Sequence, residues 1–261
     1  MSKGIVKLTE QQASALVHDD LDGAGPCLMN EGLTLTDLAA TNVVPNARIL
    51  MAELDGKGAK LTAKGNLNRK LVESLVDRFQ WQGYPAERIR DMNKVINEDD
   101  YTPALYLHAV LKLGGLARTE KGSLKLTKKG KALLPEEAAG KLQAVLLRTT
   151  FTRYNPAFLD RYEMKEIFSW QISLILYLID QFNDDWRPAD ALMRSVTIPC
   201  KEAEGARTPD TPWRTFEARV LRYLRWFGLI EEKQAAANDD WFQPKLYRKT
   251  ALYSRMLTFQ V

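Results

Sequence analysis

Residues 211–228 have the sequence TPWRTFEARVLRYLRWFG, in which both ends carry helix signals. Thr211 is a favourable N-cap residue, and Pro212 suits the first helical position because the N–H that proline lacks would be unpaired there. Gly228 is a typical residue just beyond the last turn of a helix. The stretch is therefore predicted to form one helix.

The predicted helix has an apolar side and a cationic side. At about 100° per residue, the apolar side carries Phe216, Val220, Tyr223, Leu224 and Phe227. The opposite side carries Arg214, Thr215, Arg219, Arg222, Arg225 and Trp226. We expect the apolar side to be buried in a core and the cationic side to be exposed.

Two strand-like runs follow this helix. They cover residues 229–231 and 245–248 and are separated by a polar, hairpin-like segment. A helix followed by a two-stranded hairpin is typical of a winged helix, which presents a reading helix and a wing to DNA. The carboxy-terminal part is therefore predicted to be a winged-helix unit.

The same order of elements is predicted earlier in the chain. Thr102-Pro103 opens an apolar helix, Gly115 follows its end, and residues 116–127 read as a hairpin. The pair Gly228-Leu229 occupies the place that Gly115-Leu116 occupies in the first half. Two divergent copies of one unit are therefore predicted.

We accordingly expect a mainly α protein with small β-hairpins, built from tandem winged helix-turn-helix units. The predicted division is an amino-terminal helical arm over residues 1–44, a first winged-helix unit over 45–135, a helical linker over 136–167 and a second winged-helix unit over 168–261. The arm is expected to pack against the first unit.

Several short segments, in this order along the chain, resemble those of a known family. They are LTAKGNL at 61–67, RYN at 153–155 with LD at 159–160, WRP at 186–188, RTFE at 214–217, FGL at 227–229 and RKT at 248–250. The series is similar to a family of uncharacterised bacterial proteins named after an open reading frame of a root-inducing plasmid, over roughly residues 45–260. The segment LTKKG at 126–130 also resembles the wing exit of bacterial winged-helix regulators. The resemblance implies the winged helix-turn-helix superfamily and brings no activity, substrate or catalytic residue with it.

The net charge is mild, but it is unevenly distributed. The chain has 37 Lys and Arg against 33 Asp and Glu, a difference of +4, and residues 1–50 are acidic. Between residues 112 and 131 Glu120 is the single acidic residue, and the basic residues are Lys112, Arg118, Lys121, Lys125, Lys128, Lys129 and Lys131. Lysines on a hairpin predict contacts to phosphate that carry no base specificity.

Residues expected of an enzyme or a metal protein are missing from the sequence. There is no Gly-x-Ser-x-Gly elbow, phosphate-binding loop or dinucleotide fingerprint. His18, His108, Cys27 and Cys200 do not form a metal or disulfide pattern, and His108 is expected to be a packed or surface residue. No apolar run approaches the ~20 residues that cross a bilayer. We expect a cytoplasmic, non-enzymatic protein with no catalytic residues, metal or cofactor.

The predicted function is binding of double-stranded DNA, as in a transcriptional regulator. The predicted DNA contacts are Arg214, Thr215, Arg219, Arg222 and Arg225 on the helix and Lys121, Lys125, Lys128 and Lys129 on and beyond the first wing. The apolar helix over residues 103–113 has almost no side chain with which to read bases, so it is expected to be buried or interfacial.

The arginine side of the helix is also compatible with roles that do not involve DNA. It could be a solvated surface whose arginines pair with Glu217, Glu163 or Glu166. The flanking Trp213 and Trp226 indicate instead that something covers it, and an acidic protein or the chain's own acidic arm are candidates besides DNA. The alternative function is therefore a protein-interaction scaffold, through a protein partner or self-association, without DNA contact.

Overall fold

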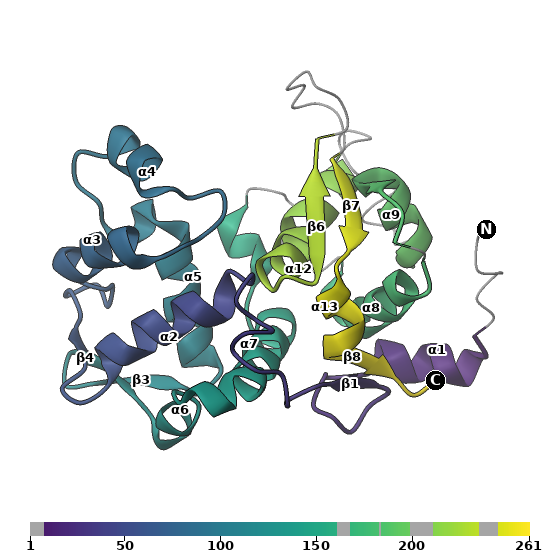
Figure 1. Ribbon diagram of the computed structural model, residues 1–261, viewed down its shortest axis with the longest axis horizontal. Coiled ribbons are helices and arrows are strands. Elements are labelled where there is room, and N and C mark those ends of the chain that lie inside the picture. Colours follow the sequence, from purple (N-terminus) through teal and green to yellow (C-terminus); the bar gives the residue numbers. More distant parts are fainter. Residues whose placement is uncertain (1–7, 161–167, 183, 199–210, 235–244) are drawn as a thin grey trace. The chain divides into compact units, whose positions relative to one another are not determined.

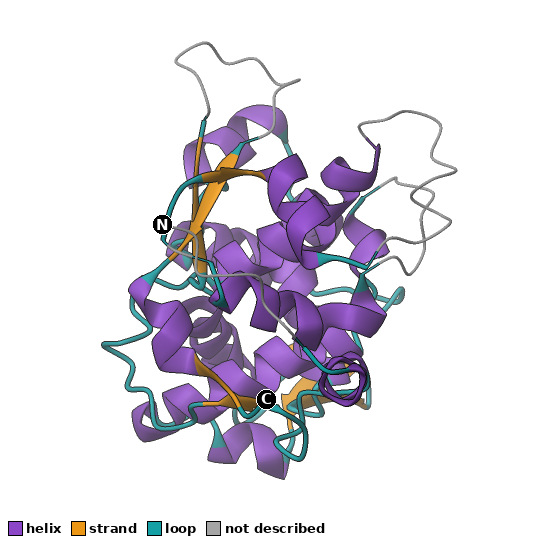
Figure 2. Ribbon diagram, turned by 90° about the vertical axis from the view of Figure 1, so that its right-hand side faces the viewer, coloured by secondary structure: helices purple, strands orange, loops and turns teal. Residues whose placement is uncertain are grey.

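The protein is mainly helical, with small antiparallel sheets of two and three strands. The computed structural model describes residues 8–160, 168–182, 184–198, 211–234 and 245–261 (Figures 1 and 2). The predicted class, mainly α with small β-hairpins, is thereby confirmed. Among the described residues, no helix is long and apolar enough to cross a membrane.

The chain forms two compact units. One consists of Glu31–Tyr154 and is called the inserted unit, because in the sequence it interrupts the other. The other consists of Met1–Asn30 together with Asn155–Val261 and is called the discontinuous unit. The predicted segments ended at residues 44, 135 and 167, whereas the observed units divide the chain after residues 30 and 154.

The inserted unit consists of helices and one three-stranded sheet. Its elements are α2 (Val43–Leu54), β2 (Ala59–Lys60), α3 (Arg69–Arg78), α4 (Ala86–Met92), η1 (Glu98–Asp100), α5 (Thr102–Leu113), β3 (Ala117–Glu120), β4 (Ser123–Leu126), α6 (Lys128–Ala132), η2 (Glu136–Ala138) and α7 (Ala139–Thr152). The antiparallel strands lie in the order β2-β4-β3. Helix α7 was predicted to be part of a linker, but it packs against α2 and α5 within this unit.

The discontinuous unit contains a three-stranded and a two-stranded sheet. Its elements are α1 (Glu10–Val17), β1 (Cys27–Met29), η3 (Pro156–Leu159), η4 (Ser169–Gln171), α8 (Ile172–Asp180), β5 (Arg187–Pro188), α9 (Ala189–Val196), α11 (Thr211–Phe216), the π-helical turn η5 (Glu217–Leu221), α12 (Arg222–Trp226), β6 (Ile230–Lys233), β7 (Leu246–Lys249), α13 (Ala251–Met256) and β8 (Leu257–Phe259). The predicted helix is therefore confirmed over residues 211–226, with a π-helical turn in its middle. We call this run of α11, η5 and α12 the long helix.

The two units share an order of elements and a sheet topology. Apart from α4 and the 3-10 turns, each has helix, strand, helix, helix, strand, strand, and the last strand lies in the middle of the sheet, as β5-β7-β6 in the discontinuous unit. Gly115 and Gly228 both end the third helix with a positive φ, of 70° and 71°. The hydroxyls of Thr127 and Thr250 donate to the carbonyls of these glycines over 2.7 and 2.6 Å. The predicted repeat thus extends to individual hydrogen bonds.

Each unit has its own apolar core. The predicted apolar side of the long helix is buried, since Phe216, Tyr223, Leu224 and Phe227 are 0% exposed and Val220 is 1% exposed. In the inserted unit the corresponding helix α5 buries Leu107 and Leu111 completely. Burial of these side chains provides most of the driving force for forming the two cores.

The amino-terminal arm belongs mainly to the discontinuous unit. Helix α1 begins with the predicted capping box of Thr9 and Gln12 and packs against α8. Strand β1 pairs antiparallel with β8, the last strand of the chain. The carboxylate of Asp19 accepts hydrogen bonds from the Cys27 N–H, at 2.8 Å, and from the Ser173 hydroxyl, at 2.9 Å. Residues 8–30 therefore belong to the discontinuous unit and not, as expected, to the first predicted unit, because strand β1 and Asp19 find partners in the carboxy-terminal half.

Candidate nucleic-acid interface

The long helix does not present an exposed cationic side. Arg219 is 3% exposed, and Thr215 and Trp226 are 0% exposed. Within the discontinuous unit the long helix packs against α9, β6 and η3, so side chains pointing away from the apolar side are also covered. The expectation of an exposed side is therefore wrong for these residues.

Arg219 forms a buried ion pair within its own unit. Its Nε donates to Asp160 Oδ2 and its Nη2 to Asp160 Oδ1, both over 2.9 Å, and both side chains are at most 4% exposed. A bidentate arginine–carboxylate pair satisfies the guanidinium edge that phosphate or guanine would otherwise use. In this conformation Arg219 is not accessible to DNA.

The remaining arginines of the long helix are partly buried. Arg225 forms an ion pair with Glu232 on β6, and its side chain is 16% exposed. The guanidinium of Arg214 lies 4.6 Å from the centre of the Trp213 ring, and Arg222 is half-buried. The sequence left open that these arginines pair with carboxylates of the same chain and do not contact DNA. Asp160 and Glu232 are carboxylate partners, whereas the suggested Glu163 and Glu166 lie outside the described residues.

The remaining suggested carboxylate, Glu217, has a different partner. It accepts a 2.5 Å hydrogen bond from the Tyr247 hydroxyl on β7. Burial, together with the nearby charges of Glu217 and Glu232, raises the pKa of Tyr247 well above its usual range. Tyr247 therefore stays protonated and keeps its ability to donate to these carboxylates.

The basic residues of strands β6 and β7 are also compensated by carboxylates. Arg248 pairs with Glu231, while Lys249 lies 3.8 Å from carboxylate oxygens of Asp180 and Asp184. Arg248 and Lys233 lie over the Trp186 ring at 4.5 and 4.4 Å from its centre. The described part of this hairpin thus carries little surplus positive charge.

The sheet of the inserted unit places its basic residues on the outer face. Leu124 and Leu126 are 0% and 6% exposed and point into the core, so the intervening Lys125 points outward, opposite Arg118 on β3. Lys60 on β2 is exposed and pairs in register with Ser123 on β4. Residues from three strands therefore bring cations to one face of a small sheet.

The hairpin tip adds a further lysine. Lys121 and Gly122 join β3 to β4 with φ values of 49° and 71°. Positive φ at both residues is typical of the two-residue type I′ turn, whose twist suits a hairpin. Lys121 is exposed, and the Gly122 carbonyl accepts a 2.9 Å hydrogen bond from the Leu61 N–H. This bond holds the segment after β2 beside the tip.

Helix α6 fixes the lysines that follow the hairpin. The Thr127 hydroxyl accepts a hydrogen bond from the Gly130 N–H at 3.0 Å and so caps the helix. A Cβ atom at Gly130 would lie 2.1 Å from the Leu116 carbonyl oxygen, so the helix can approach β3 this closely only with glycine here. The cap and this close approach fix the position of α6, and Lys128 and Lys129 at its start are exposed.

Together these segments form a surface with a large excess of positive charge, which we call the basic surface. Segments 55–64 and 117–131 contain two carboxylates, Asp55 and Glu120, and nine cations: Lys57, Lys60, Lys64, Arg118, Lys121, Lys125, Lys128, Lys129 and Lys131. Asp55 pairs with Lys131 at 3.1 Å, and Glu120 pairs with Lys125 at 2.9 Å and Arg118 at 2.6 Å. Within the described residues, the other lysines of the basic surface form no ion pair.

Only part of this surface was predicted from the sequence. The predicted contacts Lys121, Lys125, Lys128 and Lys129 lie on or beside the hairpin of the inserted unit. Three further lysines of this surface were not predicted from the sequence. Lys57 precedes β2, Lys60 lies on it and Lys64 follows it. Pairing of β2 with β4 brings these residues to the hairpin, and a two-residue strand leaves only a weak signal in the sequence.

The third helix of the inserted unit, α5, offers no base-reading side either. Among its residues only Lys112 and Leu113 are exposed. His108 is 7% exposed, and its Nδ1 lies 2.6 Å from Oε1 of the buried Glu98. The expectations that α5 is buried and that His108 can be a packed residue are confirmed.

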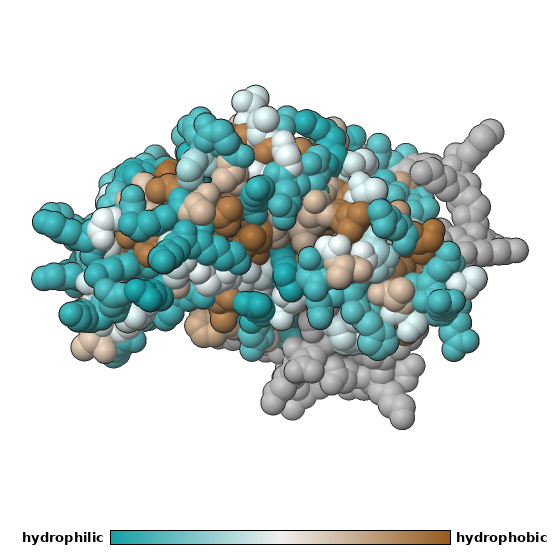
Figure 3. All heavy atoms as spheres, turned by 90° about the horizontal axis from the view of Figure 1, so that it is seen from below, coloured by the Kyte–Doolittle hydropathy of each residue, from teal (hydrophilic) through white to brown (hydrophobic). Residues whose placement is uncertain are grey.

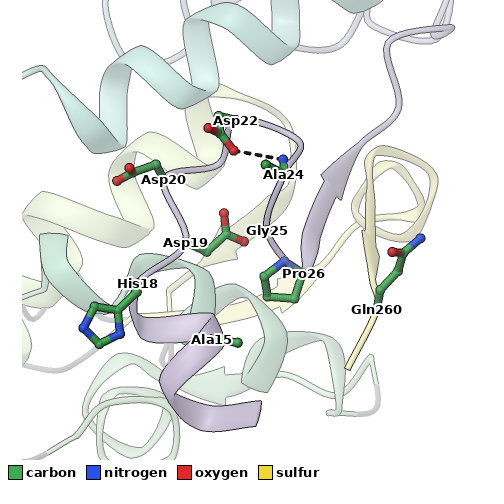
Figure 4. Close-up of a pocket in the computed structure, with 9 residues that line it drawn as sticks. All are labelled: Ala15, His18, Asp19, Asp20, Asp22, Ala24, Gly25, Pro26 and Gln260. Atoms are coloured by element: carbon green, nitrogen blue, oxygen red, sulfur yellow. Dashed lines mark hydrogen bonds between the residues drawn. The ribbon is translucent and has the colours of Figure 1, made fainter. Parts of the chain in front are cut away.

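A cleft in the discontinuous unit has the opposite charge. It has a volume of about 520 Å³ and is lined by Ala15, His18, Asp19, Asp20, Asp22, Ala24, Gly25, Pro26 and Gln260 (Figure 4). Asp22 accepts a 2.9 Å hydrogen bond from the Ala24 N–H, and Asp19 is occupied by its own hydrogen bonds. Among the described residues, no group of three or more His, Cys, Asp or Glu side chains is placed to hold a metal ion. The acidic lining makes this cleft unsuitable for phosphate.

Comparison with known proteins finds a likeness that falls mainly in the inserted unit. Residues 39–141, which include the whole basic surface, match the family model of the Y4jL N-terminal domain. Over 83 residues the chain is 37% identical to the uncharacterized protein y4jL of Sinorhizobium fredii (strain NBRC 101917 / NGR234). This aligned part is 32% of the chain and 37% of the relative, so the chain matches little more than a third of that protein's length. No solved structure matches the chain.

These matches support the predicted resemblance in a coarser form. They relate the chain to an uncharacterised bacterial protein, as expected, but the family found is that of the Y4jL N-terminal domain. The matched range ends at residue 141, whereas the predicted likeness extended to about residue 260.

Proposed function

We propose that both units are winged helices and that the inserted unit binds duplex DNA through its phosphates, without reading bases. The shared order of elements and the sheet orders β2-β4-β3 and β5-β7-β6 support the first part, because a winged helix has this arrangement of three helices and a hairpin. The second part rests on the basic surface.

The observation that carries the proposal is the charge imbalance of the basic surface. Nine cations face two carboxylates, and both carboxylates are already paired with cations of the same surface. Duplex DNA carries one negative charge per ~1.7 Å of its axis, so a cluster of lysines gains affinity by releasing condensed counterions. Such contacts position a protein on DNA but do not distinguish sequences.

The burial of both third helices supports binding without base readout. In a winged helix the third helix is the usual reader of the major groove, yet α5 and the long helix are covered within their own units. A DNA contact by Thr215 or Arg219 stays a prediction that requires the long helix to leave its packing. Arg214, Arg222 and Arg225 are more accessible, and their contact with DNA also stays a prediction.

The test compares two triple variants of equal charge in the inserted unit. Lys60, Lys121 and Lys128 are replaced by Gln on the basic surface, and Lys70, Lys94 and Lys141 by Gln at exposed positions outside it. Binding of a duplex of about 20 base pairs is followed by fluorescence anisotropy between about 50 and 200 mM salt.

The first variant is expected to lower the slope of log K against log salt by up to about 2.7, since each lost phosphate contact removes about 0.9. The second variant keeps the slope of the unaltered protein. Equal effects of the two variants, or no binding by the unaltered protein at the lowest salt, refute the proposal.

A protein-interaction scaffold is the second candidate, and one observation favours it. Met92 and Val95, at the end of α4 and just beyond it, are 69% and 43% exposed, which is more typical of a protein contact than of a DNA contact. Figure 3 draws the molecule from below, and on that face apolar side chains are scattered among hydrophilic ones. Failure of the unaltered protein to bind duplex DNA makes the scaffold the leading candidate.

A further inference from the structure

Glu120 occupies a particular position on the basic surface. It is the last residue of β3, and its two carboxylate oxygens accept hydrogen bonds from different cations. Oε1 accepts from Lys125 Nζ at 2.9 Å, and Oε2 accepts from Arg118 Nη2 at 2.6 Å. The hydrogen bond from Lys125 and the positive charges of Lys125 and Arg118 lower the pKa of Glu120, so that it stays ionised at neutral pH. One carboxylate therefore engages two of the nine cations.

The backbone fixes this arrangement. Arg118 and Lys125 are opposite each other in the antiparallel register, and Glu120 follows Arg118 on the same outer face. Gly58 has a φ of 76°, and a Cβ atom there would lie 2.5 Å from both the Leu124 carbonyl oxygen and Lys125 Cγ. The stem of Lys125 therefore lies across the glycine and directs its ammonium group toward Glu120.

We propose that Glu120 is an internal counter-ion that competes with DNA phosphates for Arg118 and Lys125 and thereby limits the affinity of the basic surface. This inference rests on the proposed function and names the residue that regulates it. A phosphate oxygen needs the same donors that the two Glu120 oxygens occupy. A carboxylate that has been displaced also remains beside the phosphate and repels it.

DNA phosphates can displace Glu120 from Arg118 and Lys125, but the displacement lowers the affinity for DNA. The side chains of Arg118, Lys125 and Glu120 are 67%, 32% and 35% exposed, and exposed ion pairs stabilise a fold only weakly. Displacing Glu120 therefore does not disturb the sheet. Asp55, the other carboxylate of the basic surface, pairs with one cation, Lys131, among the described residues.

The test replaces Glu120 by Gln, which keeps the shape of the side chain and removes its charge. The control is Asp91→Asn, because Asp91 is exposed on α4 and forms no ion pair within the described residues. Both variants change the net charge by the same amount. Affinity for a duplex is measured by anisotropy over the same salt range, and circular dichroism checks the fold.

E120Q is expected to bind about three- to tenfold more tightly at the lowest salt, with a slope steeper by about 0.9 to 1.8, since one or two cations become free for phosphate. D91N is expected to stay within about twofold of the unaltered protein, because a lone surface charge is screened. The gain of E120Q should disappear when Arg118 and Lys125 are also replaced by Gln, since the coupling lies among these three residues.

The outcomes separate this inference from the proposed function. If the unaltered protein binds and the lysine variant weakens binding, but E120Q behaves like D91N, the inference is wrong and the proposed function stands. A gain of E120Q that survives the loss of Arg118 and Lys125 also overturns the inference. No binding by the unaltered protein at the lowest salt refutes the proposed function and, with it, this inference.

Discussion

The two units share a backbone pattern but differ in how they use charge. In the discontinuous unit, Arg219, Arg225 and Arg248 each pair with a carboxylate of the same unit. In the inserted unit, the basic surface has nine cations and two carboxylates. Cationic side chains therefore stabilise the interior and the hairpin of one unit, whereas six of the nine cations of the basic surface form no ion pair within the described residues. A count of basic residues in the sequence cannot distinguish these uses.

The largest expected effect tests the buried ion pair of the discontinuous unit. Asp160→Asn removes the bidentate partner of the buried Arg219 and should lower the free energy of unfolding by about 3–5 kcal/mol. Replacing Arg214, Arg219, Arg222 and Arg225 together by Ala is expected to destabilise this unit as well. If these arginines were exposed, as the sequence predicted, the same replacement would leave the stability of the unit unchanged.

Urea denaturation measures both effects, and Asp190→Asn is the matched control. Asp190 pairs with Arg194 at 2.6 Å on the exposed surface of α9, and the loss of such a pair costs about 0.3–0.5 kcal/mol. Equal losses for Asp160→Asn and Asp190→Asn mean that the comparison between buried and exposed charges does not hold.

The next prediction concerns what the two units have in common. Leu224→Ala in the long helix and Leu111→Ala in α5 should each cost about 2–5 kcal/mol, because both side chains are 0% exposed. Leu113→Ala, at a position 41% exposed, should cost no more than about 0.5 kcal/mol. Denaturation with urea measures all three variants, and a small loss for Leu224→Ala contradicts the burial of the long helix.

The smallest expected effect distinguishes two corresponding threonines. The Thr127 hydroxyl both donates to the Gly115 carbonyl and caps α6, whereas the Thr250 hydroxyl donates to Gly228 without a side-chain cap on α13. Thr127→Val should therefore cost about 1 kcal/mol more than Thr250→Val. Hydrogen exchange of amides in α6 and α13 measures the difference, and equal protection in the two variants argues that the cap has no net effect.

Most helix limits could be predicted from the sequence because their signals are local. Thr211-Pro212 and Gly228 correctly bracket the long helix, and Thr102-Pro103 correctly opens α5. The spacing of Phe216, Leu224 and Phe227 correctly identified a buried side. Each of these signals involves residues within a few turns of one another, where backbone preference and periodicity act directly.

The errors concern contacts between residues far apart in the chain. Asp160, the partner of Arg219, lies 59 residues earlier and follows the short turn η3. Strand β1 pairs with β8 at the opposite end of the chain, so most of the predicted arm belongs to the discontinuous unit. Lys60 reaches the basic surface only because β2 pairs with β4.

The sequence by itself determined where most helices and hairpins lie, which side of the long helix is apolar and which segments are rich in lysine. The tertiary structure decided which of the cationic side chains reach the solvent. The physical reason is that helical periodicity fixes the direction of a side chain around its axis, but not what packs against that direction. Arg219 and Lys125 have the same charge, and only the surrounding elements bury the first in an ion pair and leave the second at the surface.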